Sequence, residues 1–113
     1  MSALDRLFSV VAYLRRNLHP DFALPQLHIF LLVCQRPGIT QTEIEEALGM
    51  PHGSVSRNVK MLSRFNVPEN GEIVQMGYGL VRTEPDLTER RRNAVWLTQR
   101  GEEVRDELIR LME

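Results

Sequence analysis

Three basic side chains recur at helical spacing near the middle of the chain, and their chemistry suits the binding of a polyanion. Arg57, Lys60 and Arg64 stand three and four positions apart, so a helix would carry them within about 60° of one another. Guanidinium and ammonium groups bind phosphate oxygens, and arginine also recognises the edges of bases. No acidic residue occurs between Pro51 and Pro68 to repel phosphates. The pattern predicts a surface that contacts DNA.

Two serines stand at the start of the same predicted helix. Ser54 and Ser56 lie close to the basic positions, where a helix in the major groove usually meets base edges. The positive end of the helix dipole also favours a phosphate there. Basic side chains on a helix are equally common as a solvated outer face, so this pattern alone leaves both interpretations open.

A run of three arginines, Arg90, Arg91 and Arg92, lies between two segments with the composition of strands. At the tip of a β-hairpin such side chains can enter the minor groove, whose negative potential attracts guanidinium groups. By itself the run could equally be a loop kept soluble by its charge. Beside a basic helix it is typical of the wing of a winged helix, and the two features support each other.

Proline, glycine and hydrophobic periodicity divide the chain into the elements that must position these side chains. The sequence predicts helices over about residues 4–18, 25–36, 40–48, 52–65 and 102–112, and strands over 72–83 and 93–98. The first strand is expected to be broken around Gly77 and Gly79. We expect one domain with N-terminal helices (1–36), a helix-turn-helix (39–65), an insertion and wing (66–98) and a C-terminal helix (99–113).

The helix-turn-helix prediction depends on how its two helices begin and end. Thr40 and Glu43 form a capping-box pattern at the start of the first helix, and Gly49 ends it. The second helix begins near His52, and its apolar face is made of Val55, Val59 and Leu62. Two short helices joined by such a turn can place the outer face of the second in the major groove of DNA.

Four segments, in this order, resemble winged-helix regulators of the MarR (multiple antibiotic resistance regulator) type over roughly residues 27–101. GITQTEIEEALGM and GSVSRNVKML are similar to the helix-turn-helix of that family, and GLVRT and ERRRNAVWLTQRGEEV are similar to its wing and the following helix. Some features depart from the family pattern. Glu89 replaces the aspartate that orients a wing arginine, and an insertion of about a dozen residues, Asn66 to Tyr78, precedes the wing strand.

The resemblance implies a mainly α (α+β) fold, a winged helix-turn-helix with a small antiparallel β-hairpin as its wing. It also implies binding to double-stranded DNA by three groups of residues. Base or groove contacts are implied for His52, Ser54, Ser56 and Arg57, phosphate contacts for Thr40, Gln41 and Lys60, and minor-groove insertion for Arg90 or Arg91. The spacing of basic residues independently favours Arg57, Lys60, Arg64 and the run that ends at Arg92.

The composition argues against several other classes of protein. The chain has 113 residues, of which 42% are hydrophobic and 26% charged, and its net charge of -1 does not suit a polycation that coats nucleic acid. Cys34, the one cysteine, lies in an apolar segment, so we expect a core residue rather than a redox sensor, in a cytoplasmic protein. The three histidines are scattered and no catalytic motif occurs, so we expect no enzyme activity, metal or cofactor. The longest apolar run, 29–34, is too short to cross a membrane.

Apolar stripes on the first and last predicted helices exceed what a small core needs, and we expect them to form a homodimer. A dimer would present two recognition helices to a palindromic site. The sequence thus predicts a DNA-binding transcriptional regulator, most simply a repressor that blocks polymerase, with an unknown effector ligand. Two alternatives stay open: an accessory factor for replication, partition, or phage or plasmid DNA, and a winged helix that binds proteins instead of DNA. The 66–78 insertion favours the second alternative.

Overall fold

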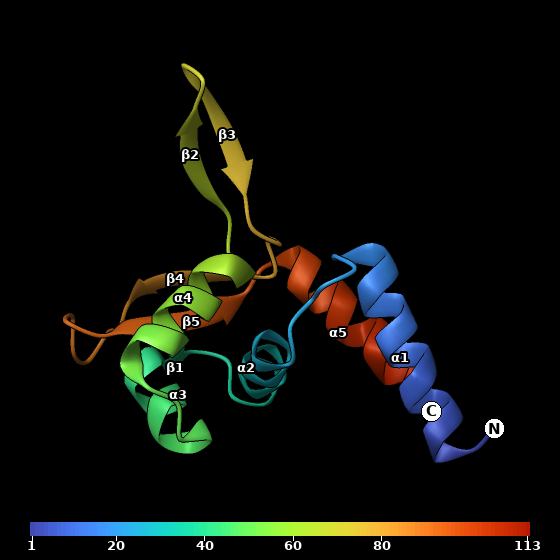
Figure 1. Cartoon of the computed structure of the whole chain (residues 1–113). Helices are drawn as coiled ribbons and strands as arrows, with labels where there is room; N and C mark the ends of the chain where they lie inside the picture. Colours follow the sequence, from blue (N-terminus) through green and yellow to red (C-terminus); the bar gives the residue numbers. More distant parts are fainter.

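The computed structural model describes all residues, 1–113. A helical body carries a small sheet, and a separate two-stranded hairpin projects from it (Figure 1). The helices are α1 (Ala3–Asn17), α2 (Leu24–Gln35), α3 (Gln41–Leu48), α4 (His52–Leu62) and α5 (Gln99–Met112), and the strands are β1 (Ile39–Thr40), β2 (Phe65–Glu69), β3 (Glu72–Met76), β4 (Val81–Pro85) and β5 (Asn93–Leu97). None of the helices combines the length and the hydropathy that crossing a lipid bilayer requires.

Local signals account for the boundaries of the first three helices. In α1 the Ser2 hydroxyl accepts a hydrogen bond from the backbone N–H of Asp5, whose carboxylate in turn accepts one from the N–H of Ser2. Pro25 occupies the first turn of α2, where a missing N–H costs nothing. Gly49 ends α3 in the left-handed conformation, with a φ of 63°. The predicted positions of these helices are confirmed.

The sheet has the strand order β1-β5-β4, and all of its pairings are antiparallel. Ile39 of β1 pairs with Val95, and Val81 of β4 pairs with Leu97. The loop 86–92, which carries the arginine run, joins β4 to β5 as the tip of a wing. The predicted winged helix-turn-helix fold is therefore confirmed.

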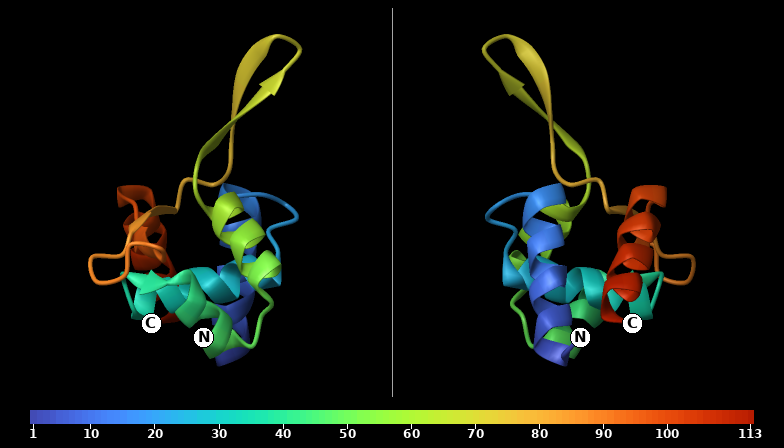
Figure 2. Two further views of the ribbon diagram at one scale, coloured as in Figure 1. Left: turned by 90° about the vertical axis from the view of Figure 1, so that its left-hand side faces the viewer. Right: turned by 90° about the vertical axis from the view of Figure 1, so that its right-hand side faces the viewer.

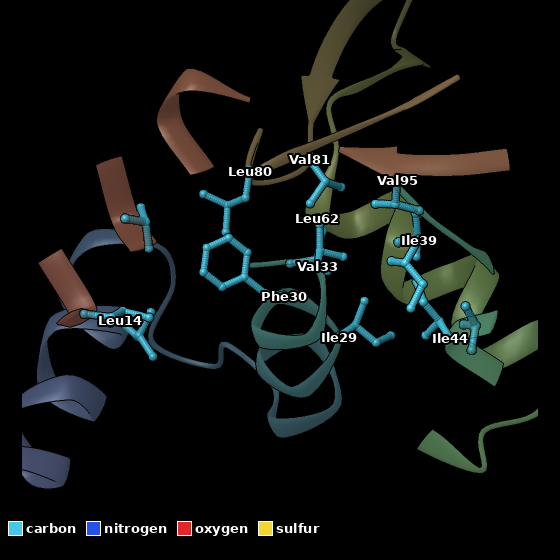
Figure 3. Packing of buried hydrophobic residues seen from close by; sticks show 14 of the residues in the cluster. Leu14, Ile29, Phe30, Val33, Ile39, Ile44, Leu62, Leu80, Val81 and Val95 are labelled. Atoms are coloured by element: carbon cyan, nitrogen blue, oxygen red, sulfur yellow. The ribbon is translucent and has the colours of Figure 1, made fainter. Parts of the chain in front are cut away.

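The core lies between α2 and the elements that surround it (Figure 3). Ile29, Phe30 and Val33 of α2 are completely buried, which explains why this helix is apolar on nearly every side. They belong to one cluster with Leu62 of α4 and Val95 of β5. Burial of such a side chain contributes about 1.5–3 kcal/mol, so α2 fixes the helix-turn-helix relative to the wing.

The insertion forms a hairpin of its own, which corrects the predicted arrangement of strands. The sequence predicts one broken strand over 72–83, but residues 72–76 pair with 65–69, and only residues 81–85 pair with β5. The chain leaves the hairpin through Gly77, whose φ is 93° and where a Cβ atom would lie 1.8 Å from the carbonyl oxygen of Ser63. Only glycine fits at this crossing, so the break separates two different hairpins.

Helix α4 ends earlier than the spacing of its basic residues predicts. Ser63 adopts an extended conformation, and its hydroxyl donates a hydrogen bond to the carbonyl oxygen of Lys60 at 2.7 Å. The helix therefore stops at Leu62, and Arg64 lies beyond it. The prediction that Arg64 shares a helical face with Arg57 and Lys60 is wrong, because the helical period does not continue past Ser63.

Helix α5 begins three residues before its predicted start, and its first turn is held against the wing. The Thr98 hydroxyl accepts a hydrogen bond from the N–H of Gly101 at 3.0 Å and donates one to the carbonyl oxygen of Gly79 at 2.6 Å. Gly101 is buried, and a Cβ atom there would lie 2.1 Å from the carbonyl oxygen of Leu80. The start of α5 is thus tied to the segment that enters β4.

Candidate nucleic-acid interface

One face of α4 is buried in the core and the opposite face is exposed. The buried face is made of Val55, Val59 and Leu62, each at most 1% exposed. Ser56, Arg57 and Lys60 are exposed on the other side. Neither cation takes part in an ion pair within the chain, so both are available to an external anion.

The first turn of α4 holds two further predicted site residues. His52 is exposed, and its Nδ1 lies 2.9 Å from Oε2 of Glu45 on α3. Ser54 is half-buried, and its carbonyl oxygen accepts a hydrogen bond from the side-chain amide of Asn58 at 2.9 Å. His52 can reach a ligand directly, whereas Ser54 borders the surface rather than projecting from it.

The start of α3 binds its own cap. Thr40 is only 4% exposed. Its hydroxyl accepts a hydrogen bond from the N–H of Glu43 at 3.2 Å and donates one to the Glu43 carboxylate at 2.9 Å. Gln41 is half-buried beside it. The Thr40 side chain therefore serves the capping box, and it could bind a phosphate only by giving up this cap.

This cap predicts a contribution to stability that depends on pH. The pKa of Glu43 lies below its ordinary value, because the backbone N–H and the hydroxyl of Thr40 bind the carboxylate and the guanidinium groups of Arg36 and Arg92 attract it. Since the unfolded chain binds this proton more readily, the stabilisation is complete above the ordinary pKa of 4.5 and is lost as the pH falls through the lowered value.

We expect Glu43→Gln to flatten the fall in the free energy of unfolding between about pH 5 and pH 3. Glutamine can keep the geometry of the capping box but does not titrate. Denaturant unfolding of both proteins at a series of pH values measures the difference. If the free energy of unfolding fell equally with pH in the variant and in the original chain, the Glu43 carboxylate would not be the source of this pH dependence.

The wing tip is an ordered turn that exposes its arginines. The Asp86 carboxylate accepts a hydrogen bond from the N–H of Glu89 at 3.1 Å, and the N–H of Asp86 donates to the carbonyl oxygen of Arg92 at 2.8 Å. Arg90, Arg91 and Arg92 are all exposed, and none of them forms an ion pair. The Glu89 carboxylate thus holds no wing arginine here, and Asp86 shapes the turn instead.

Arg64 lies beyond the end of α4, the helix that carries Arg57 and Lys60. Its side chain lies against Gly79 and lines an open cleft of about 580 Å³ together with Arg82 and Arg100. Arg82 and Arg100 were not expected from the sequence. They come from β4 and α5, and no local pattern connects three arginines that only the fold brings together.

The predicted binding residues otherwise gather on one side of the molecule. Figure 1 shows α3, α4 and the wing tip opposite α1 and α5, and the left view of Figure 2 faces this side. The elements that carry these exposed cations, α4 and the wing tip, therefore lie on the same side of the molecule, as binding to one polyanion requires.

Comparisons with known proteins agree with this geometry. Residues 21–64 match the model of the MarR family. The transcriptional regulator HosA of Escherichia coli O127:H6 is 35% identical over 85 residues, which are 75% of this chain and 53% of HosA. The chain thus spans about half the length of the curated relatives that it matches.

Solved structures extend the likeness over nearly the whole chain. The crystal structure of MarR superposes with a TM-score of 0.63 at 24% identity and covers 97% of this chain and 75% of MarR. The transcriptional regulator Tm0710 from Thermotoga maritima gives 0.64 at 24% identity, over 96% of this chain and 68% of Tm0710. At this identity the superpositions show a shared fold.

Proposed function

The chain belongs to the MarR family, and from this premise we propose that it is a sequence-specific regulator of transcription that binds double-stranded DNA. The observation that carries the proposal is that α4, with Ser56, Arg57 and Lys60 exposed, lies on the same side of the molecule as the wing tip. A recognition helix in the major groove and a wing beside it would use these two surfaces at once. The activity is regulatory rather than enzymatic.

Each part of this surface is suited to a different contact. Arg57 and Ser56 would meet base edges, with His52 and Ser54 at the helix start bordering the same groove. Lys60 would bind a phosphate, and the first turn of α3 would bind another through its backbone N–H groups, with Gln41 beside them. Arg90 or Arg91 would enter the minor groove next to the site.

We also propose that the protein is a homodimer through α1 and α5, which lie side by side. These helices expose an unusually apolar surface whose members are Leu4, Leu7, Phe8 and Val11 on α1 and Ile109 and Met112 on α5. Large exposed apolar patches typically mark interfaces. A two-fold axis here would make the DNA site a palindrome, and binding over a promoter would repress by excluding polymerase.

Selection of bound duplexes from a random pool tests the proposal directly. We expect enrichment of a palindrome whose half-sites are about one helical turn apart. Failure to enrich any sequence, with no loss of the fold, would reject sequence-specific DNA binding. Enrichment of a single half-site would retain DNA binding but reject the dimer.

Lys60→Ala is expected to weaken the binding of all duplexes by a similar factor. A lysine that neutralises one phosphate releases about one counterion, so the slope of log affinity against log salt should become shallower by about 0.9. Titrations by fluorescence anisotropy at several salt concentrations measure this slope. Arg16→Ala, which removes an exposed cation from α1, is the matched control and should leave the slope unchanged. If the slope were unchanged in Lys60→Ala, Lys60 would not contact a phosphate.

A further inference from the structure

The hairpin made of β2 and β3 stands apart from the winged helix. Its strands pair with each other and belong to no other sheet, and Figures 1 and 2 show it projecting clear of the body. Asn70 and Gly71 at the turn have φ values of 52° and 79°, as a tight two-residue hairpin turn requires. An isolated two-stranded hairpin is marginally stable in water, so this arm needs a surface to cover it.

The register divides the hairpin into two unlike faces. Residues directly opposite each other share a face, and alternate residues along a strand do the same. One face, called here the arm face, consists of Phe65, Val67, Val74 and Met76 with Glu69 and Glu72 at the tip. The opposite face consists of Asn66, Pro68, Ile73 and Gln75. The arm face is thus apolar along its length and acidic at its end.

DNA does not suit the arm. No lysine, arginine or histidine occurs between residues 65 and 81. The only charges on the hairpin are the carboxylates of Glu69 and Glu72, which would be repelled by phosphates. Its partner should instead offer an apolar surface that ends in a cation.

The base of the same arm face carries such a cation. The ammonium nitrogen of Lys60 lies 4.7 Å from the centre of the Phe65 ring, and Lys60 is exposed. From base to tip the surface therefore runs from a positive charge through apolar side chains to two carboxylates. Two such surfaces are complementary when they meet in opposite directions.

We propose that the arms of two copies of this chain pack arm face to arm face, antiparallel, about a two-fold axis. Val67 and Val74, in the middle of the strands, would lie close to the axis and contact their own counterparts. Glu69 and Glu72 of each copy would reach Lys60 of the other, so paired arms and a DNA phosphate would compete for Lys60. The contact is isologous, as closed pairs of identical chains require.

The shape of the hairpin permits this pairing. Five residues per strand span about 17 Å, and the arm projects from the body (Figure 1), so its faces are open to a second copy. Pro68 lacks an N–H and weakens the edge of β2 as a site for adding another strand, which favours pairing through the faces. This contact is separate from the apolar surface of α1 and α5, and together the two would give assemblies larger than a dimer.

Disulfide cross-linking tests the axis directly. In a Cys34→Ala background we expect Val74→Cys to form a covalent dimer under mild oxidation at least about ten times faster than Ile73→Cys. The neighbouring position is the matched control because Ile73 is more exposed, at 69%, but lies on the opposite face. Equal rates for the two variants, or faster reaction of Ile73→Cys, would overturn the proposal.

Mass in solution gives an independent measurement. We expect the original chain to grow beyond a dimer as its concentration rises, and Val74→Lys to stop this growth while Ile73→Lys does not. Far-UV circular dichroism would show whether each variant keeps its helices. An assembly whose mass is the same for the original chain, Val74→Lys and Ile73→Lys would exclude pairing through the arm. Neither Val74 nor Ile73 belongs to the proposed DNA-binding surface, so selection of bound duplexes judges the regulatory function separately.

Discussion

Phe8→Lys is expected to separate the proposed homodimer into monomers and to lower affinity for a palindromic operator by about 100-fold or more. Phe8 is 76% exposed on α1, in a row with Leu4, Leu7 and Val11. An unpaired ammonium group buried in that interface would cost more than the contact provides. Loss of the second half-site contact removes the gain of bivalent binding, which reaches 10²–10⁴. Sedimentation and anisotropy titrations measure the two effects.

Binding to a single half-site distinguishes lost pairing from lost folding. A Phe8→Lys monomer should bind a duplex with one half-site as tightly as the original chain, because α4 and the wing are far from α1 (Figure 1). Leu87→Lys adds a lysine at a wing-tip residue that is 97% exposed. It is the control for the mass measurement, and this variant should remain dimeric. Both measurements are made with Val74→Lys present, so that the arms do not contribute. A Phe8→Lys chain that stays dimeric would place the interface elsewhere.

Features that depend on a few neighbouring residues could be predicted from the sequence. The capping residues of α3, the glycine at its end and the apolar α2 all depend on contacts or periodicity within one or two turns. The wing was also predicted, because its arginine run stands between two apolar segments. These elements define the winged helix, so the fold class followed from local patterns together with the resemblance of four ordered segments.

The sequence does not predict the β2–β3 hairpin, although its turn carries a recognisable signal. Asn70-Gly71 is the dipeptide most typical of a tight β-turn, but Pro68 and the polar residues around it favoured a loop. The sequence predicts a break at Gly77. That the break separates two hairpins depends on the close contact between Gly77 and the backbone of Ser63, which no local pattern reveals. Because the chain breaks at Gly77, β3 does not continue into β4 and instead pairs with the preceding strand, β2.

Two site residues show what periodicity and resemblance leave undetermined. Arg64 fits the helical spacing but falls outside the helix, because the hydrogen bond from Ser63 to the Lys60 carbonyl ends α4. Thr40 was expected both to cap α3 and to bind a phosphate, and the single hydroxyl is already used in the cap. Sequence patterns locate residues along an element, whereas their availability depends on the hydrogen bonds that the fold has already formed.

Arg57→Ala is expected to reduce discrimination between the operator and an unrelated duplex by about 1–3 kcal/mol, or roughly 5- to 150-fold. Arg57 is exposed and its guanidinium lies beside Gly53, one turn nearer the start of α4, where a Cβ atom would be 3.0 Å from the terminal nitrogen. The side chain is therefore directed toward the end of the helix that meets base edges. Affinity for the unrelated duplex should fall much less, because phosphate contacts dominate nonspecific binding.

Arg57→Lys separates a base contact from a phosphate contact at the same position. Lysine keeps the positive charge but lacks the planar pair of donors that binds a guanine edge at two points. If Arg57 recognises a base, the lysine variant should bind the unrelated duplex like the original chain and still discriminate poorly, as the alanine variant does. Restored discrimination with lysine would assign Arg57 to the phosphate backbone, and sequence recognition would then have to come from Ser56, His52 or the wing. Both variants are compared on the selected operator and on a scrambled duplex at one salt concentration.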